Sequence, residues 1–255
     1  LESIPERWHL VAMIDDASNE VPYARFFPKD TVFGNMYVIR RFVELKGIFS
    51  CLYVDKASHF TTSRHSGIYY SISPEQDETQ IERALKELNI NIITANSPQA
   101  KGRIERLFSL FQDRLVKEMR LAGIKDYEQA SRFLVKKFLP FYNKRFSRKV
   151  ESSYFPLPKN TDLDTVFSKK YERIVKADNT IQVMSQTIQI PPTPTRFSFR
   201  KAKVDVCVLE SGRVLVMYKG EVICESQLSE NNRTVEKKRN IEEFLDAREY
   251  VTCSS

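Results

Sequence analysis

The stretch INIITANSPQAKGRIERLFSLF, residues 90–111, contains the pattern that decides the fold. Its first five residues, Ile90–Thr94, are mostly apolar and β-branched, which predicts a short strand. Ser97 and Pro98 then supply a helix cap and a favoured first helical residue, and the apolar positions that follow recur every three or four residues. A strand that runs directly into a long helix predicts one βα unit of an α/β sheet.

The preceding and following segments continue this alternation of strands and helices. Apolar runs at His9–Ile14 and Val21–Phe27 flank the turn-forming residues Asp16–Asn19, which predicts a β-hairpin. The other helices and the other strand are expected at Thr31–Lys46, Cys51–Val54, Glu78–Leu88 and Tyr127–Asn143. Together these elements predict an α/β core over residues 1–148, with helices on both faces of its sheet.

The second half of the chain has a different texture. Residues 149–168 contain two prolines and no clear period, which predicts a linker. Residues 169–228 contain a series of short strands separated by turns, which predicts a small antiparallel β-barrel. The expected strands are Ile181–Met184, Thr187–Ile190, Ala202–Leu209, Val214–Tyr218 and Glu221–Cys224. Residues 229–255 are polar and charged, and predict a surface tail.

The positive charge of the chain is concentrated in one region. The formal net charge is +7, but Lys101–Lys149 alone contains 14 Lys and Arg against five Asp and Glu. A concentrated basic region favours a polyanionic partner, with nucleic acid first, while a solvated helix face is the alternative. Four widely spaced cysteines and an opening segment without a secretion signal predict a cytoplasmic protein with reduced thiols. No apolar run approaches the ~18 residues that a membrane span needs, so we expect no membrane partner.

Two carboxylates stand where chemistry is expected. Asp55 directly follows a predicted strand, and ligand crevices of open α/β sheets lie at the carboxyl ends of strands. Glu105 lies about two turns into the long helix. Cations suited to a phosphate backbone surround it, namely Lys101, Arg103 and Arg106. Two converging carboxylates would hold Mg²⁺ or Mn²⁺, although a turn role for the Asp and a surface role for the Glu are the ordinary alternatives.

Several motifs, taken in order, resemble those of DDE-type transposases and retroviral integrases. The run Tyr53–Phe60, which contains Asp55, resembles their second acidic motif, and Asn96–Arg106 resembles their third. Leu10–Ser18 is similar to the second strand of that catalytic core, and Phe141–Arg145 to the segment that ends it. Tyr171–Arg173 and Asp178–Thr180 look like parts of the DNA-binding barrel that follows the core in many insertion-sequence transposases.

The resemblance implies a fold, an activity and a set of partners. The fold would be a ribonuclease-H-like mixed sheet flanked by helices, followed by the small barrel. The activity would be a two-metal-ion polynucleotidyl transfer with Mg²⁺ or Mn²⁺, in which Asp55 and Glu105 are catalytic metal ligands. The partners would be transposon ends, target DNA and further copies of the chain, with no small-molecule substrate, in a bacterial cytoplasm and on the nucleoid when bound.

Two departures from the family pattern stand out. Between Asp55 and Glu105 lie 49 residues, a long spacing that fits an insertion around Thr61–Gln80. The family's first catalytic Asp lies on a strand before His9, and that first strand is missing here. Asp15 and Asp16 are the only nearby acids, and they match a non-catalytic position, with a role as the missing ligand as the alternative; we therefore expect this chain alone to be inactive. The alternatives are a catalytically dead, transposase-derived DNA-binding protein and, with less support, another ribonuclease-H-like nuclease such as a junction resolvase.

The predicted barrel has its own candidate DNA contacts. Basic residues cluster near its first strands, and those predicted to bind DNA are Arg173, Arg200, Lys201 and Lys203. Tyr171, Phe197 and Phe199 are interleaved among the cations, an arrangement that suits base stacking and backbone contact. The alternative is that these aromatic residues form the barrel core.

Overall fold

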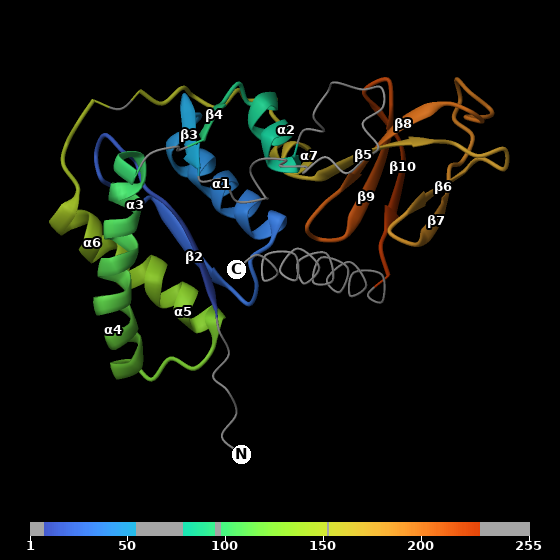
Figure 1. The fold of residues 1–255 in the computed structure, drawn as a ribbon. Coiled ribbons are helices and arrows are strands. Elements are labelled where there is room, and N and C mark those ends of the chain that lie inside the picture. The colour runs from blue at the N-terminus through green and yellow to red at the C-terminus, as the bar shows by residue number, and fades with distance from the viewer. Residues whose placement is uncertain (1–7, 55–78, 95–97, 152, 230–255) are drawn as a thin grey trace, which may run out of the picture. The chain divides into compact units, whose positions relative to one another are not determined.

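The chain divides into two compact units in the computed structural model, Leu1–Phe167 and Ser168–Ser255. The structure describes residues 8–54, 79–94, 98–151 and 153–229 (Figure 1). None of the helices within these ranges is long and apolar enough to cross a bilayer.

The first unit alternates strands and helices in the predicted order. Its strands are β1 (His9–Met13), β2 (Tyr23–Phe27), β3 (Cys51–Val54) and β4 (Asn91–Thr94). Its helical elements are α1 (Val32–Lys46), α2 (Gln80–Glu87), α3 (Pro98–Leu110), η1 (Phe111–Leu115), α4 (Val116–Leu121), α5 (Tyr127–Phe133), η2 (Leu134–Phe138), α6 (Leu139–Phe146) and α7 (Leu163–Val166). The π-helical turns η1 and η2 join α3 to α4 and α5 to α6. The helices and strands expected from the periodicity are confirmed to within a few residues.

The strands of the first unit pair in two separate ladders. β1 and β2 form an antiparallel hairpin, and β3 and β4 pair in parallel. Within the described ranges, β1 pairs only with β2 and β3 only with β4. The mixed α/β class is therefore confirmed, whereas a continuous ribonuclease-H-like sheet stays a prediction.

The β1–β2 hairpin lies between two helical layers. Leu10, Ala12 and Ile14 pack into a cluster with residues of α3–α6, whereas Met13 packs into a second cluster with α1 and α2. Successive side chains of a strand point to opposite faces, so the alternation along β1 separates the two clusters. Figure 1 shows α1 on one side of the hairpin and α5 on the other. Helices on both faces agree with the sequence prediction.

Part of the segment expected as a linker, residues 149–168, packs within the first unit. Leu163, Val166 and Phe167 are buried in the cluster that α1 and α2 form. A backbone bridge joins Ile48 to Phe155, with both N–H···O distances at 2.8 Å. Gly47 allows this approach, because its φ is 95° and a Cβ there would lie 2.5 Å from the Phe155 carbonyl oxygen. The absence of a period hid this packing, since the apolar residues are spaced irregularly around two prolines.

The second unit consists of antiparallel strands. They are β5 (Lys169–Ile174), β6 (Thr180–Val183), β7 (Gln186–Gln189), β8 (Lys203–Val208), β9 (Arg213–Tyr218) and β10 (Glu221–Gln227). Four of them form a sheet in the order β10-β9-β8-β5, and β6 and β7 form a separate hairpin. The five expected strands are confirmed, and β5 is an additional one. Among residues 168–229 no closed barrel is formed by the recorded pairings, so barrel closure stays a prediction.

Candidate functional site

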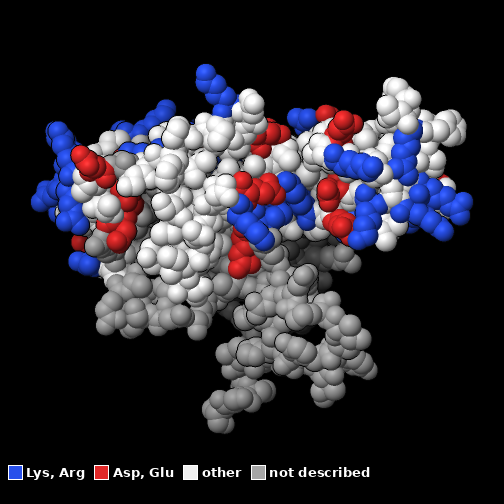
Figure 2. Space-filling view, turned by 90° about the horizontal axis from the view of Figure 1, so that it is seen from above, with Lys and Arg blue, Asp and Glu red and all other residues white. Residues whose placement is uncertain are grey.

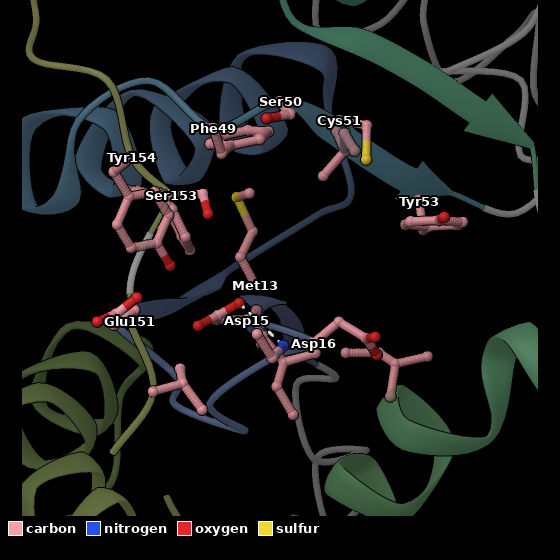
Figure 3. A pocket seen from close by; sticks show the side chains of 17 residues that line it. Met13, Asp15, Asp16, Phe49, Ser50, Cys51, Tyr53, Glu151, Ser153 and Tyr154 are labelled. Atoms are coloured by element: carbon pink, nitrogen blue, oxygen red, sulfur yellow. Dashed lines mark hydrogen bonds between the residues drawn. The ribbon is translucent and has the colours of Figure 1, made fainter. Parts of the chain in front are cut away.

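A cavity of about 710 Å³ in the first unit is lined by elements far apart in the sequence. Met13 and Asp15 come from the end of β1, Tyr53 from β3, Ile104 from α3 and Tyr154 from the segment after α6. Figure 3 shows Cys51 and Tyr53 on one side of the opening and Met13, Asp15 and Asp16 on the other. The cavity therefore lies between the two ladders of the first unit, at the end of β1.

Asp15 organises the turn that follows β1. Its carboxylate accepts hydrogen bonds from the Ala17 N–H at 3.1 Å, from the Ser18 N–H at 3.2 Å and from the Ser18 hydroxyl. Burial raises the pKa of Asp15, but the bonds from Ser18 and Ala17 outweigh it and hold the pKa below its ordinary value. The side chain is thus an ionised cap of the β1–β2 turn, although it borders the cavity.

The Tyr154 hydroxyl lies beside the same carboxylate (Figure 3). Its hydroxyl oxygen is buried and has no hydrogen-bond partner of normal geometry within the described ranges. Burial, and then the negative charge of Asp15, raise the pKa of the Tyr154 hydroxyl. The Tyr154 hydroxyl is consequently neutral at physiological pH and offers the cavity an uncharged polar group.

Acidic side chains are present at this cavity, but the described residues do not assemble a metal centre. Asp15, Asp16 and Glu151 all border it. Over residues 8–54, 79–94, 98–151 and 153–229, no group of three His, Cys, Asp or Glu side chains is close enough to hold a metal ion. The cysteines that lie in these ranges, Cys51, Cys207 and Cys224, carry free thiols.

Only one of the two predicted catalytic residues, Glu105, lies within the described residues. Asp55 lies outside the described residues. Glu105 is exposed on α3, and its neighbour Ile104 lines the cavity together with Tyr53, which lies two residues before Asp55. Val54 pairs with Thr94 in the parallel ladder, so β3 and β4 end at the same sheet edge. β3 ends at Val54, the residue before Asp55 in the sequence, and α3 is the first described element after β4 and begins at Pro98.

The cations predicted to bind DNA in the first unit all belong to α3. Lys101 and Arg103 lie on this helix, but their side chains are outside the described set. Arg106 is exposed and donates from Nε to the Gly102 carbonyl at 2.9 Å. It borders a second hollow of about 480 Å³ together with Arg148, a residue that the sequence analysis did not select.

The region around Arg148 is tied to the β1–β2 turn by contacts that no local pattern predicts. The Arg148 N–H donates to the Ser18 carbonyl at 2.9 Å, and its Nε donates to the Ala17 carbonyl at 3.1 Å. Asn143 pairs with both backbone groups of Val21, accepting from its N–H at 2.9 Å and donating to its carbonyl at 3.0 Å. The end of α6 thus fixes the turn that carries Asp15.

The second unit carries the remaining predicted DNA contacts, and they fall into two sets. Arg173 on β5 stacks over Tyr171 at 5.1 Å and donates to the Gln182 carbonyl, while Lys203 on β8 pairs with Glu172 at 3.0 Å. Arg200 and Lys201 are exposed in the loop between β7 and β8. Figure 2 shows Lys and Arg side chains gathered over this unit, on the right, with acidic side chains between them.

The structure separates the aromatic residues that the sequence left ambiguous. Phe199 is 1% exposed and belongs to the core of the second unit, as does the partly buried Tyr171. Phe197, two residues earlier, is 83% exposed. The core explanation therefore holds for Phe199 and Tyr171, whereas Phe197 stays a candidate for contact with DNA.

Comparisons with known proteins identify relatives for most of the chain. No protein-family model matches it. A protein of Sinorhizobium fredii (strain NBRC 101917 / NGR234), provisionally named transposase y4bF, is 32% identical over 215 residues, which are 83% of this chain and 46% of that protein. The transposase for insertion sequence IS1202 of Streptococcus pneumoniae is 30% identical over 184 residues, which are 71% of this chain and 38% of that protein. The chain thus spans less than half the length of both curated relatives.

Among solved structures, one chain of a simian T-cell lymphotropic virus intasome, solved by cryo-electron microscopy in complex with PP2A regulatory subunit B56 gamma, is weakly similar. The TM-score is 0.41 at 13% identity, covering 87% of this chain and 73% of that chain. A likeness of this size adds no argument about fold or function.

Proposed function

Because this chain belongs to the family of insertion-sequence transposases, we propose that its first unit carries part of a site that cuts and joins DNA strands. The proposed catalytic residues are Asp55 and Glu105. The proposed DNA contacts of this unit are Lys101, Arg103 and Arg106, which share α3 with Glu105.

One observation carries this proposal. Tyr53 and Ile104 line the same cavity although 50 residues separate them in the sequence. Each stands close to a proposed carboxylate, because Asp55 follows Tyr53 by two residues and Glu105 follows Ile104 directly. The parallel pairing of β3 with β4 gives the physical reason, since both strands end at one edge and α3 starts beyond it.

The donor set fits a hard divalent cation in part. Carboxylate oxygens are the ligands that Mg²⁺ and Mn²⁺ prefer, and Asp55 and Glu105 would supply two of them. When bound, such a cation would polarise a phosphate and favour the deprotonated form of an attacking hydroxyl. Asp15 is engaged in its own turn, so we propose that the remaining acid lies on a strand absent from residues 8–54, 79–94, 98–151 and 153–229.

The two separate ladders support the finer fold proposal. In a ribonuclease-H-like sheet, the resemblance implies one more strand than the described residues contain. We place that strand in the space between β1 and β3, where the cavity lies and where each strand has one edge without a recorded partner strand. For the second unit, we propose that the four-stranded sheet and the β6–β7 hairpin form a small barrel that holds DNA through Arg173, Arg200, Lys201 and Lys203.

A matched pair of substitutions on one continuous helical stretch tests the catalytic proposal. In the full-length transposase, Asp55→Asn or Glu105→Gln should lower Mn²⁺-dependent strand cleavage and joining at least about 100-fold, because a carboxamide is a poor ligand for a hard cation. Asp113→Asn, eight residues further along and also exposed, should leave both reactions within about twofold. DNA binding, measured in parallel without metal, should be retained by all three variants.

Two results would contradict the proposal. Full activity in Glu105→Gln would remove Glu105 from the site. Robust nicking by residues 1–255 alone that disappears in Asp55→Asn would show that the chain holds all the metal-binding acids. The expectation that the first catalytic Asp lies on a strand before His9 would then be wrong.

The second candidate is a DNA-binding protein without catalysis. It is supported by the Lys and Arg side chains gathered over the second unit (Figure 2). An Asp on an apolar strand encoded within about 20 residues upstream of Leu1 supports the enzyme, and a start codon at Leu1 supports the binder.

A further inference from the structure

The loop between β7 and β8 presents a bare aromatic ring. Phe197 is 83% exposed, whereas Phe199, two residues later, is buried in the core of the second unit. A single exposed apolar side chain is ordinary on a protein surface. The support behind this ring and the charges beside it set Phe197 apart.

The loop is held in place on both sides of Phe197. The Asn179 side-chain oxygen accepts from the Phe199 N–H at 2.8 Å and from the Ser198 hydroxyl at 3.2 Å. Before the ring, Thr193 and Arg196 exchange backbone hydrogen bonds at 2.9 and 3.1 Å. The hydrogen bonds of its neighbours therefore hold the backbone around Phe197, which lowers the cost of ordering the loop on binding.

Arg196 is part of this support. Its guanidinium lies 4.9 Å from the Tyr218 ring centroid and 5.2 Å from that of Phe199, and it donates to the Ser198 carbonyl at 2.7 Å and to the Tyr218 hydroxyl. Because Nε, one terminal nitrogen and the planar face of Arg196 are engaged within the protein, this side chain stiffens the loop. It also joins the loop to Tyr218 at the end of β9.

Exposed cations occur in the loop of Phe197 and in the turn after Tyr218. Arg200 and Lys201 follow Phe197 in the same loop, and Lys219 lies in the turn after Tyr218. Acidic residues are also present in this framework: Glu221 follows Lys219 by two residues, and Asp178 precedes Asn179 and accepts through Oδ1 from the Thr180 hydroxyl at 2.7 Å and from the Thr180 N–H at 3.2 Å. A ring among cations suits a ligand that offers an aromatic face and negative charge together.

We infer that Phe197 is a stacking platform for an unpaired nucleobase, with Arg200 and Lys201 contacting the flanking phosphates. This inference rests on the proposed DNA-binding function and names the form of DNA. In a duplex, the base faces are covered by their neighbours, so a protruding ring finds a free face only at a strand end or on a single strand. Phosphate contacts position the strand, and the ring adds affinity that does not depend on base identity.

Substitution of the ring tests the inference on the whole chain. Phe197→Ala should bind a single-stranded 15-mer roughly 5- to 150-fold more weakly than the wild type, the size of base–aromatic stacking removed by alanine. Its affinity for a covalently closed circular duplex, which has neither strand ends nor unpaired bases, should change less than twofold. The matched control is Phe155→Ala, which removes an exposed phenyl ring from the first unit and should alter neither affinity. Circular dichroism of both variants should equal that of the wild type.

A fluorescent variant separates base stacking from phosphate binding. In Phe197→Trp, the single-stranded 15-mer should quench the added tryptophan, whereas an abasic strand of equal length should not. Wild-type protein, with Trp8 as its only tryptophan, supplies the baseline.

The outcomes distinguish this inference from the proposed function. Unchanged single-strand affinity in Phe197→Ala, with salt-dependent duplex binding intact, overturns the stacking role and leaves DNA binding standing. Equal weakening for single-stranded, abasic and duplex DNA also overturns it, because the ring would then not act on bases. If the wild type binds none of these ligands, the DNA-binding function of the second unit falls with it.

Discussion

The two units hold their candidate functional residues on different kinds of support. In the first unit, the cavity collects side chains from β1, β3, α3 and the segment after α6, which span residues 12–154. In the second unit, the candidate contacts lie on neighbouring strands or within one loop, and Arg200 and Lys201 are adjacent in sequence. The first site therefore depends on long-range packing, whereas the second depends on local geometry and exposed charge. Substitutions that break long-range ties should destabilise the first unit, while charge substitutions in the second should alter binding but not stability.

The largest effect in this comparison is expected from Asn143. Val21 is fully buried, and the Asn143 amide satisfies both its N–H and its carbonyl from 122 residues away. Asn143→Ala should lower the free energy of unfolding by about 2 kcal/mol, because it leaves a buried backbone donor and acceptor unpaired. Urea denaturation followed by Trp8 fluorescence measures this, since Trp8 packs in the cluster beside Val21.

Lys144→Ala is the control, because Lys144 is the exposed neighbour of Asn143 on the same helix and should cost less than about 0.5 kcal/mol. Equal effects of the two substitutions would show that the tie between α6 and the hairpin does not stabilise the first unit. The contrast with the second unit would then lose its physical basis.

Ser18 should give a smaller effect that depends on pH. Its hydroxyl is one of the donors that lower the pKa of Asp15, so Ser18→Ala should destabilise the protein by about 1 kcal/mol at pH 7. A lowered carboxyl pKa contributes stability above about pH 4, the ordinary range of an Asp, and this stability is lost as the pH falls through the lowered value. The difference between wild type and Ser18→Ala should therefore shrink as the pH falls below about 4.

Denaturation midpoints measured between pH 2 and about pH 7 follow this difference. Ser109→Ala, which replaces an exposed serine on α3, should differ in stability from the wild type by an amount that does not vary with pH. A difference for Ser18→Ala that stays constant down to pH 2 would mean that the turn is not held by an ionised Asp15.

The elements of both units were predictable where the pattern was local. The apolar spacing of residues 31–46 predicted α1 closely, and the turns between short apolar runs predicted the strands of the second unit, where Gly212 and Gly220 adopt positive φ. β5 was missed because Lys169 and Lys170 look like surface residues, although Lys169 is buried in the strand. An inward-facing lysine disguises the alternation that would otherwise indicate a strand.

The residues of the candidate sites were likewise predictable only where a local sequence pattern marks them. Asp55 and Glu105 could be selected because each follows a local element, a strand end and a helix start. The roles of Asn143 and Arg148 could not, because their partners Val21, Ala17 and Ser18 lie more than 120 residues away and leave no periodic trace. The exposure of Phe197 beside the buried Phe199 was equally hidden, since both residues have the same type and the same basic neighbours.

Substitution of Glu172 should give the smallest change in stability, together with a clear change in DNA affinity. Its carboxylate pairs with Lys203 at 3.0 Å across the β5–β8 pair, and the side chains are 60% and 68% exposed. Exposed pairs of this kind contribute little, so Glu172→Gln should change the free energy of unfolding by less than about 0.5 kcal/mol. Removing the negative charge should nevertheless raise duplex DNA affinity about two- to fivefold at low salt, a gain that disappears at high salt.

Glu225→Gln provides the spatial control. Glu225 pairs with Arg213 at 3.0 Å with similar exposure, but it lies on β10, the opposite edge of the same sheet from β5. A larger gain for Glu172→Gln places the DNA on the β5–β8 side, where Arg173 and Lys203 lie. Equal gains in affinity would mean that only the net charge matters. No gain from either variant would remove Arg173 and Lys203 from the proposed interface. Removal of the Glu172 charge must strengthen the attraction between Lys203 and a phosphate bound beside it.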